Sequence, residues 1–126
     1  MFENKKEKKL NKEKELNKEI KIESNNINFF KFEIIIEGKV IGRAYLYLIR
    51  NDLHIKPYGF LEDVFIEEEY RGKSIGKELI KKVIEKAKEL GCYKLIATSR
   101  LERENVHKLY ENLGFKKWGY EFRIDL

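Results

Sequence analysis

The sequence predicts an α/β fold, in which helices pack against a mixed sheet. Two observations lead to this prediction. Apolar residues recur at every second position after residue 28 and at every third or fourth position further on, which are the spacings of strands and of helices. The predicted elements follow one another in the order β-β-β-α-β-α-β. At 126 residues, the chain is long enough for one domain with one hydrophobic core.

The first 26 residues differ in composition from the rest of the chain. The segment from Met1 to Glu23 contains eight Lys and six Glu, with few large apolar side chains. We expect residues 1–26 to form a charged extension, either a solvated helix or a tail, in front of a folded domain at 27–126. Contact with nucleic acid would need aromatic or Arg side chains interleaved with these lysines, and the segment does not provide them.

Three strands are predicted at the start of the folded domain. Residues 29–37 alternate between apolar and charged side chains, which predicts a strand with one buried face. A two-residue connection, Gly38–Lys39, would turn the chain into a partner strand at 40–49. A loop closed by Pro57, the only proline, then leads to a third strand at 58–66.

Two helices and two further strands complete the predicted fold. Apolar residues spaced by three and four predict a long amphipathic helix over 75–90, and Gly91 is well placed to end it. Residues 93–98 follow as a strand, buried on both faces if it is central in the sheet. A shorter helix is expected at 103–113, and the segment "FKKWGYEFRI" at 115–124 predicts a final strand.

The stretch "YRGKSIGKEL" lies where the third strand ends and the long helix begins. Backbone N–H groups of a first helical turn have no partner within the helix, the helix dipole adds positive charge there, and glycine lets an anion approach closely. This combination favours binding of a phosphate group. A nucleotide P-loop is excluded because Gly72 and Gly76 are one residue too close and Glu78 replaces the magnesium-binding hydroxyl. The alternative is an ordinary capped helix after a tight turn.

The extended stretch "YRGKSIGKELI" resembles the signature loop Q/R-x-x-G-x-G/A of the GNAT acetyltransferase superfamily. Arg71 and Gly76 match the signature, and Ser74 replaces its first glycine. The segment "LEDVFIEEEY" is similar to the strand that precedes the loop in that superfamily, and "VHKLYENLGF" at 106–115 resembles its last conserved block. The three pieces come in the family's order, and the resemblance covers residues 29–126.

The resemblance implies a mixed, mostly antiparallel central sheet flanked by helices, with a short N-terminal part. It also implies an N-acetyltransferase that moves the acetyl group of acetyl-CoA to a primary amine by direct attack in a ternary complex, without a metal. The loop would hold the pyrophosphate of acetyl-CoA, and the strand before it would pair with the pantetheine arm. The residues implied in cofactor binding are Val64, Phe65, Ile66, Arg71, Gly72, Lys73, Ser74, Ile75, Gly76 and Lys77.

Two residues are expected to carry out the proton transfers. We favour Glu62 as the base for the acceptor amine, directly or through water. The adjacent Asp63 points to the other side of the strand and is a weaker candidate for substrate binding. The alternative is that both carboxylates are solvated or paired with lysines. Tyr110 matches the family's general acid, because a phenol stays protonated at neutral pH. By periodicity alone, Tyr110 would be a core aromatic.

One position departs from the family pattern. Many members carry an Asn seven residues before the catalytic Tyr, where this chain has Arg103, and Asn105 is the nearest Asn. Both residues are candidates for contact with the cofactor arm. His54 and His107 are expected at the surface, and no group of residues has the spacing of a metal site.

Two other classes of function compete with this interpretation. A non-catalytic acyl-CoA-binding module is less favoured because Glu62 and Tyr110 are both retained. A small basic nucleic-acid-binding protein is suggested by the net charge of +5, but aromatic residues interleaved with Arg are lacking. No apolar run approaches the roughly 20 residues that cross a bilayer. The single Cys92 favours a reducing cytoplasm, and neither a membrane nor a nucleic acid is expected as a partner.

The sequence leaves the acceptor open between a small amine and a polypeptide amine. Family members usually place a strand and two helices before the hairpin that begins here at Phe29, and those helices wall one side of the acceptor cleft. This chain has room for about one helix there. An aromatic strand at a sheet edge is also a liability if it is exposed. We therefore predict a homodimer in which the C-terminal strands help to complete the acceptor site.

Overall fold

A computed structural model describes residues 28–126 as one four-stranded sheet with two α-helices. The strands β1 (Asn28–Ile36), β2 (Lys39–Ile49), β3 (Tyr58–Ile66) and β4 (Leu95–Ala97) lie in the order β1-β2-β3-β4. β1, β2 and β3 pair antiparallel, whereas β3 and β4 pair parallel. The expected mixed, mostly antiparallel sheet is confirmed. The charged extension predicted for residues 1–26 lies outside the described residues.

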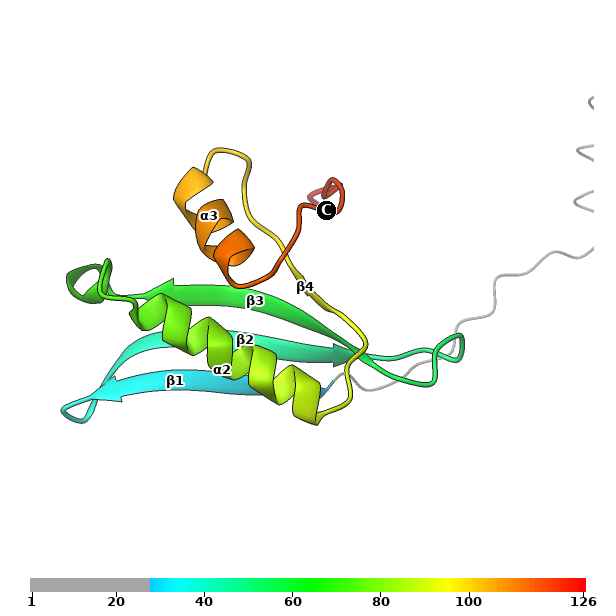
Figure 1. The fold of residues 1–126 in the computed structure, drawn as a ribbon, viewed down its shortest axis with the longest axis horizontal. Coiled ribbons are helices and arrows are strands. Elements are labelled where there is room, and N and C mark those ends of the chain that lie inside the picture. The colour runs from blue at the N-terminus through cyan, green and yellow to red at the C-terminus, as the bar shows by residue number, and fades with distance from the viewer. Residues whose placement is uncertain (1–27) are drawn as a thin grey trace, which may run out of the picture.

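The longer helix lies across one face of this sheet (Figure 1). A short 3-10 helix η1 (Glu68–Tyr70) follows β3 and leads into α2 (Ile75–Glu89), which crosses the strands. The second helix, α3 (Glu104–Asn112), comes after β4. Its residues Leu109, Tyr110 and Leu113, the last just beyond its end, pack against the same buried cluster that α2 contacts. The two predicted helices are confirmed.

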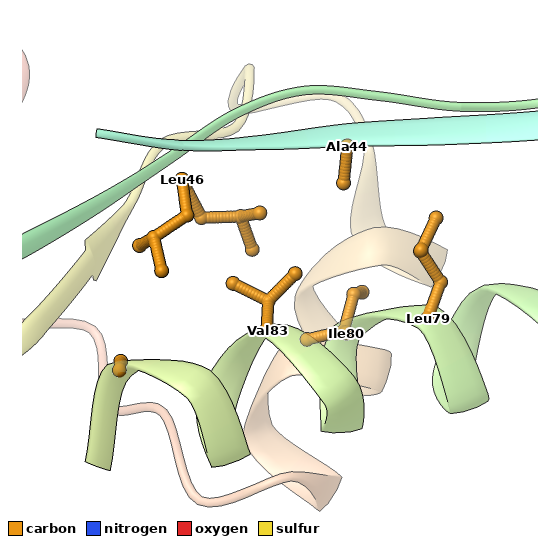
Figure 2. Packing of buried hydrophobic residues seen from close by; sticks show 7 residues of the cluster. Ala44, Leu46, Leu79, Ile80 and Val83 are labelled. Atoms are coloured by element: carbon orange, nitrogen blue, oxygen red, sulfur yellow. The ribbon is translucent and has the colours of Figure 1, made fainter. Parts of the chain in front are cut away.

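The core lies between α2 and the central strands, as Figure 2 shows. Leu79, Ile80 and Val83 of α2 face Ala44 and Leu46 of β2, and all five side chains are buried. These α2 residues are three and four positions apart, so that one stripe of the helix is covered by the sheet. Full burial of a branched aliphatic side chain stabilises the fold by about 1.5–3 kcal/mol.

The first hairpin turns one residue earlier than predicted. β1 ends at Ile36, which pairs with Lys39, so the two turn residues are Glu37 and Gly38. Both have positive φ angles, 50° and 76°. Positive φ at both central residues is the geometry of a type I′ turn, whose twist matches that of the flanking strands. The predicted Gly38–Lys39 connection is therefore wrong by one position.

In the second half of the sheet, the predicted fourth strand forms but is shorter than 93–98, and the predicted final strand is wrong. The fourth strand is limited to Leu95–Ala97 and is the last strand of the sheet, so its residues are only half-buried. The strand predicted at 115–124 does not form, since no strand is present among residues 113–126. A strand needs a neighbour to receive its backbone hydrogen bonds, and this segment pairs with none of the four described strands.

Candidate active site

β3 separates from β4 less than halfway along β3. The two strands pair at Gly59, Phe60 and Leu61 only. Beyond Leu61, β3 keeps its pairing with β2 but has no strand neighbour on the β4 side within residues 28–126. The backbone from Glu62 onward therefore borders a place where hydrogen-bonding groups of an extended ligand can add to the sheet.

A bulge marks the point where the two strands separate. Tyr45 of β2 pairs with Glu62 and Arg43 pairs with Phe65, so β3 carries one extra residue over this interval. Asp63 within it has a φ of 52°. Bulges bend a strand and redirect its side chains, and they are frequent beside active sites. The bend places Val64 and Ile66 against the core and leaves Phe65 exposed on the other face.

The loop between β3 and α2 leaves backbone N–H groups free. Ser74, the residue before α2, has a φ of 64°, and its hydroxyl does not cap the helix. The N–H groups of Ile75, Gly76 and Lys77 donate no hydrogen bond within the described chain. Three unpartnered donors at the positive end of a helix dipole form a suitable site for a phosphate. Lys73 and Lys77 are exposed beside them.

Glycine is favoured at positions 72 and 76 for different physical reasons. Gly72 has a φ of 76°, a backbone conformation that favours glycine. Gly76 lies in α2, where a Cβ atom would stand 3.7 Å from Ile66 Cγ1, an ordinary contact distance. Because the fold leaves room for a side chain at Gly76, its small size is better explained by a ligand that approaches the backbone.

Arg71 is held against the end of β3. Its Nε donates a hydrogen bond of 2.7 Å to the carbonyl of Ile66. Its guanidinium also lies 5.4 Å from the centre of the Phe65 ring, and that of Arg43 lies 5.0 Å from the same ring. The carbonyl of Ile66 is thus occupied by Arg71. Arg43 had not been predicted at the site, and only its pairing with Phe65 across the sheet reveals it.

A shallow depression of about 420 Å³ lies next to this stack of Phe65 and two arginines. It is lined by Phe65, Glu67, Glu68, Glu69 and Arg71. Its three carboxylates disfavour a phosphate, and Glu67 forms an ion pair of 3.1 Å with Lys39. The depression is therefore a poorer phosphate site than the N-terminus of α2, and the three glutamates are surface charges.

Glu62 and Asp63 have different surroundings. Glu62 is half-buried, while Asp63 is exposed. Burial raises the pKa of the Glu62 carboxyl above its ordinary value, and the charges of Asp63 and Glu121 raise it further. A carboxylate with a raised pKa is a stronger base. Glu121 was not predicted near the site, since it is distant in sequence and lies in the segment after α3.

Tyr110 comes to the site from α3. Its ring packs 5.2 Å from that of Phe115, and burial raises the pKa of the Tyr110 phenol above its ordinary value. The charge of Arg103 lowers this pKa and that of Glu62 raises it, so all three groups are close enough to interact. The Tyr110 hydroxyl forms no hydrogen bond within the described residues. The predicted acid and the predicted base thus come from separate elements, α3 and β3, and lie within range of each other's charge.

The remaining predicted residues lie around the start of α3. Arg103 immediately precedes α3, and Asn105 is exposed in its first turn. His107 has Nε2 2.8 Å from the carbonyl of Arg100, which gives it a structural role in this connection. His54, within the loop that joins β2 to β3, stacks on Tyr93 with ring centres 5.0 Å apart.

Ser99 was also not predicted from the sequence as a site residue. It lies two residues after β4, and its hydroxyl oxygen is buried without a hydrogen-bond partner in the described chain. Buried hydroxyl groups nearly always have a partner. A ligand placed beside the end of β4 would supply one, but an isolated serine gives no signal of this in the sequence.

Residues 28–126 offer neither a metal site nor a membrane-spanning helix. No three or more His, Cys, Asp or Glu side chains are grouped in a way that would hold a metal ion. Neither described α-helix is long and apolar enough to cross a membrane.

Comparison with known proteins identifies the family. The sequence profile of the Acetyltransferase (GNAT) family matches residues 2–115, and the chain belongs to this family. It is 34% identical over 90 residues to the glucosamine 6-phosphate N-acetyltransferase of Trypanosoma brucei brucei, which covers 71% of this chain and 59% of the relative. It is 38% identical over 80 residues to a probable glucosamine 6-phosphate N-acetyltransferase of Drosophila melanogaster, covering 63% of this chain and 35% of the relative.

A solved structure agrees with the fold. A putative acetyltransferase from Agrobacterium tumefaciens str. C58 superimposes with a TM-score of 0.74 at 25% identity, covering 98% of this chain and 81% of that one. The chain spans less than two thirds of the length of the two curated relatives above. The resemblance noted in the sequence is confirmed by these matches.

Proposed function

We propose that this protein is an N-acetyltransferase that uses acetyl-CoA to acetylate a primary amine. The main support for this proposal is that the edge of β3 beyond Leu61 has no strand neighbour and leads to the uncapped N-terminus of α2. An extended ligand with a phosphate at one end fits this arrangement. Acetyl-CoA has that form, and family membership supports it as the co-substrate.

The residues of the free edge and of the loop would hold acetyl-CoA. The N–H groups of Ile75, Gly76 and Lys77 would donate to its pyrophosphate, each charge-assisted bond contributing roughly 1.5–3 kcal/mol. The backbone of Val64 and Phe65 would pair with the pantetheine arm. Arg103, Asn105 and the Ser99 hydroxyl are candidates for further contacts at the far side of that arm.

Two side chains would then move the protons. Glu62 would accept a proton from the acceptor amine, directly or through one water, so that the amine nitrogen can attack the thioester carbon. Tyr110 would donate its phenolic proton to the sulfur as the carbon–sulfur bond breaks. Burial keeps Tyr110 protonated, because its pKa is raised. Asp63 is exposed beside Glu62 and is a candidate for contact with the acceptor.

The acceptor is either a small amine or the amine of a polypeptide. The names of the two curated relatives above specify glucosamine 6-phosphate as the acceptor. Small amino sugars should therefore be tested first. We propose in addition that the enzyme is a homodimer and works in the cytoplasm, the latter because its only cysteine cannot form an internal disulfide.

A CoA-release assay across a panel of amines tests the proposed function. The panel should contain amino acids, polyamines, aminoglycosides, glucosamine 6-phosphate and a peptide with a free N-terminus. We expect release of CoA that depends on one class of acceptor. Tight binding of acetyl-CoA without turnover on any amine would instead favour a non-catalytic acyl-CoA-binding module.

A further inference from the structure

The face of the sheet opposite α2 carries a group of aromatic side chains. Along β1 and β2, every second side chain packs in the core beside α2, so the side chains between them point to the other face. There Phe29, Tyr45 and Tyr47 lie together, with ring centres between 5.8 and 6.4 Å apart, and we call them the aromatic platform. Phe60 of β3 pairs with Tyr47 and continues this row. Phe29 is 57% exposed and both tyrosines are half-buried, so the platform presents ring surface to solvent.

The platform adjoins Glu62 through Tyr45. Tyr45 of β2 is the cross-strand partner of Glu62 on β3. Directly paired residues of antiparallel strands share a face, with Cβ atoms about 4.5–5.5 Å apart. The neighbouring pair, Leu46 and Leu61, is buried in the core on the α2 side, which places Tyr45 and Glu62 on the opposite face. The Tyr45 ring is therefore beside the carboxyl group that we propose as the base.

The expected position of acetyl-CoA limits where the acceptor can lie. The cofactor arm would run along the free edge of β3, on the side of Glu62 that faces away from β2. The acceptor nitrogen has to lie between Glu62 and the thioester carbon, so the rest of the acceptor extends away from the cofactor. The Phe65 ring, further along β3, is already contacted by the guanidinium groups of Arg43 and Arg71. This leaves the Tyr45 ring, the direct neighbour of Glu62, as the surface for the body of the acceptor.

The charges on the two sides of Tyr45 differ in sign. Lys31, its partner on β1, has Nζ 5.8 Å from the centre of the Tyr45 ring, and Arg43 stands two residues before Tyr45 on the same face. Lys31 also forms a 3.6 Å ion pair with Glu33, which offsets part of this positive charge. On the Glu62 side, the neighbouring charges are carboxylates. An ammonium group is therefore favoured at Glu62, whereas a second positive charge above Tyr45 would lie next to two cations.

We propose that Tyr45 determines acceptor specificity, and that the acceptor is a monoamine with a ring that packs flat on Tyr45 while its nitrogen reaches Glu62. The inference rests on the proposed function, in which Glu62 is the base. The chemistry that Tyr45 recognises is a flat apolar ring surface, which an aromatic ring or the C–H side of a sugar ring provides. A rigid ring also loses less conformational freedom on binding than an open chain does.

Four amines used as acceptors test this specificity. Glucosamine carries a sugar ring and phenethylamine an aromatic ring, octylamine has as many carbon atoms as phenethylamine but no ring, and spermidine carries several positive charges. CoA release by the full chain should be measured over a range of each amine. We expect kcat/KM for one of the two ring amines to exceed the values for octylamine and spermidine about tenfold or more. An equal or higher value for octylamine or spermidine would overturn the specificity but leave the acetyl transfer itself intact.

Substitutions of Tyr45 separate a positioning role from a catalytic one. Tyr45→Ala should raise KM for the preferred ring amine about tenfold or more, while kcat and the KM for acetyl-CoA stay near the wild-type values. Tyr45→Phe restores the ring and should recover the KM. Tyr93→Ala, at an exposed aromatic residue beside the β2–β3 loop, is the matched control. Circular dichroism checks folding, and Tyr45→Leu replaces Tyr45→Ala if the alanine variant is unfolded. A KM that does not change when the ring is removed would contradict the proposal.

Calorimetric titration of the same four amines into the full chain saturated with CoA separates this inference from the proposed reaction. Binding of a ring amine that is lost in Tyr45→Ala, without turnover of any amine, would support ring recognition by Tyr45 and refute the reaction. Turnover of a ring amine with the same affinity in wild type and Tyr45→Ala would support the reaction and overturn the role of Tyr45. A wild type that neither binds nor acetylates glucosamine or phenethylamine would also overturn it.

Discussion

Ser74 shows how a single residue adapts the phosphate loop. It stands where the family signature has glycine, and its φ of 64° is a conformation that costs most non-glycine residues roughly 1–2 kcal/mol. The loop therefore keeps the backbone shape expected for glycine in spite of the substitution. The sequence alone identified the replacement, but not whether the loop would keep this shape.

Ser74→Gly should stabilise the protein or leave it unchanged, because the left-handed strain is removed while unfolded-state entropy increases. Affinity for acetyl-CoA should be kept or improved. Thermal unfolding and calorimetric titration measure the two effects, and Ser74→Ala is the matched control, since it removes the hydroxyl but keeps the strain. A large loss of affinity in both variants would show that the hydroxyl itself binds the phosphate.

Tyr110→Phe should lower kcat by about 10²-fold or more while acetyl-CoA affinity stays near normal. The substitution keeps the ring and its packing on Phe115 but removes the phenolic proton that we propose is donated to sulfur. Steady-state kinetics on the acceptor found in the panel measures the loss, and Tyr93→Phe, next to the β2–β3 loop, is the control. An unchanged kcat would show that Tyr110 only packs in the core and does not act as the acid.

The pH dependence of the reaction should reflect Glu62. Because its pKa is raised, chiefly by burial, Glu62 is still protonated at pH values where a surface glutamate is ionised. The base is active only when ionised, so kcat/KM should fall as the pH drops through this raised pKa. The folded state also binds the proton more tightly than the unfolded state, so the contribution of Glu62 to stability is lost as the pH rises through the same range.

A pH–rate profile of the wild type and of Glu62→Gln tests this assignment. The variant should lose most of its activity, and the acidic limb should be absent from what remains. Should Glu62→Gln keep both the wild-type rate and the acidic limb, another group or water alone would be the base.

At the scale of single elements, periodicity predicted the helices better than the strands. The apolar stripe of α2 was evident because its spacing continues over four turns, and Gly91 has the positive φ of 77° expected after a helix. The hairpin was misplaced by one residue because Glu37 is an unusual choice for positive φ. The bulge at Asp63 was not predicted, since it depends on how β2 and β3 pair.

Ile80→Ala should lower the free energy of unfolding by about 2–5 kcal/mol, the usual cost of truncating a buried aliphatic side chain. Ile80 is 1% exposed between α2 and the sheet. Chemical denaturation measures the change, and Lys81→Ala, on the exposed side of the same helix, should alter stability by less than about 0.5 kcal/mol. Equal effects at the two positions would contradict the packing of α2.

At the level of the whole molecule, the sequence offered candidate site residues but not the residues that surround them in the fold. The loop residues and the proposed proton donor could be predicted because they belong to local motifs around Arg71 and Tyr110. Arg43, Ser99 and Glu121 were missed because they approach the site only through the pairing of strands and the path of the chain after α3. The C-terminal strand pattern was recognised, but its failure to form within one chain depends on which neighbour is present.

The proposed function depends on binding of acetyl-CoA at the N-terminus of α2, and calorimetric titration with acetyl-CoA measures this binding. The wild type should bind. Gly76→Ala should also bind, because the fold has room for one methyl group and the family signature accepts alanine there. Gly76→Val should abolish binding, since its branched side chain blocks the approach of the phosphate to the backbone, while circular dichroism shows it folded. Unchanged affinity in a folded Gly76→Val, or no binding by the wild type, would contradict the assignment.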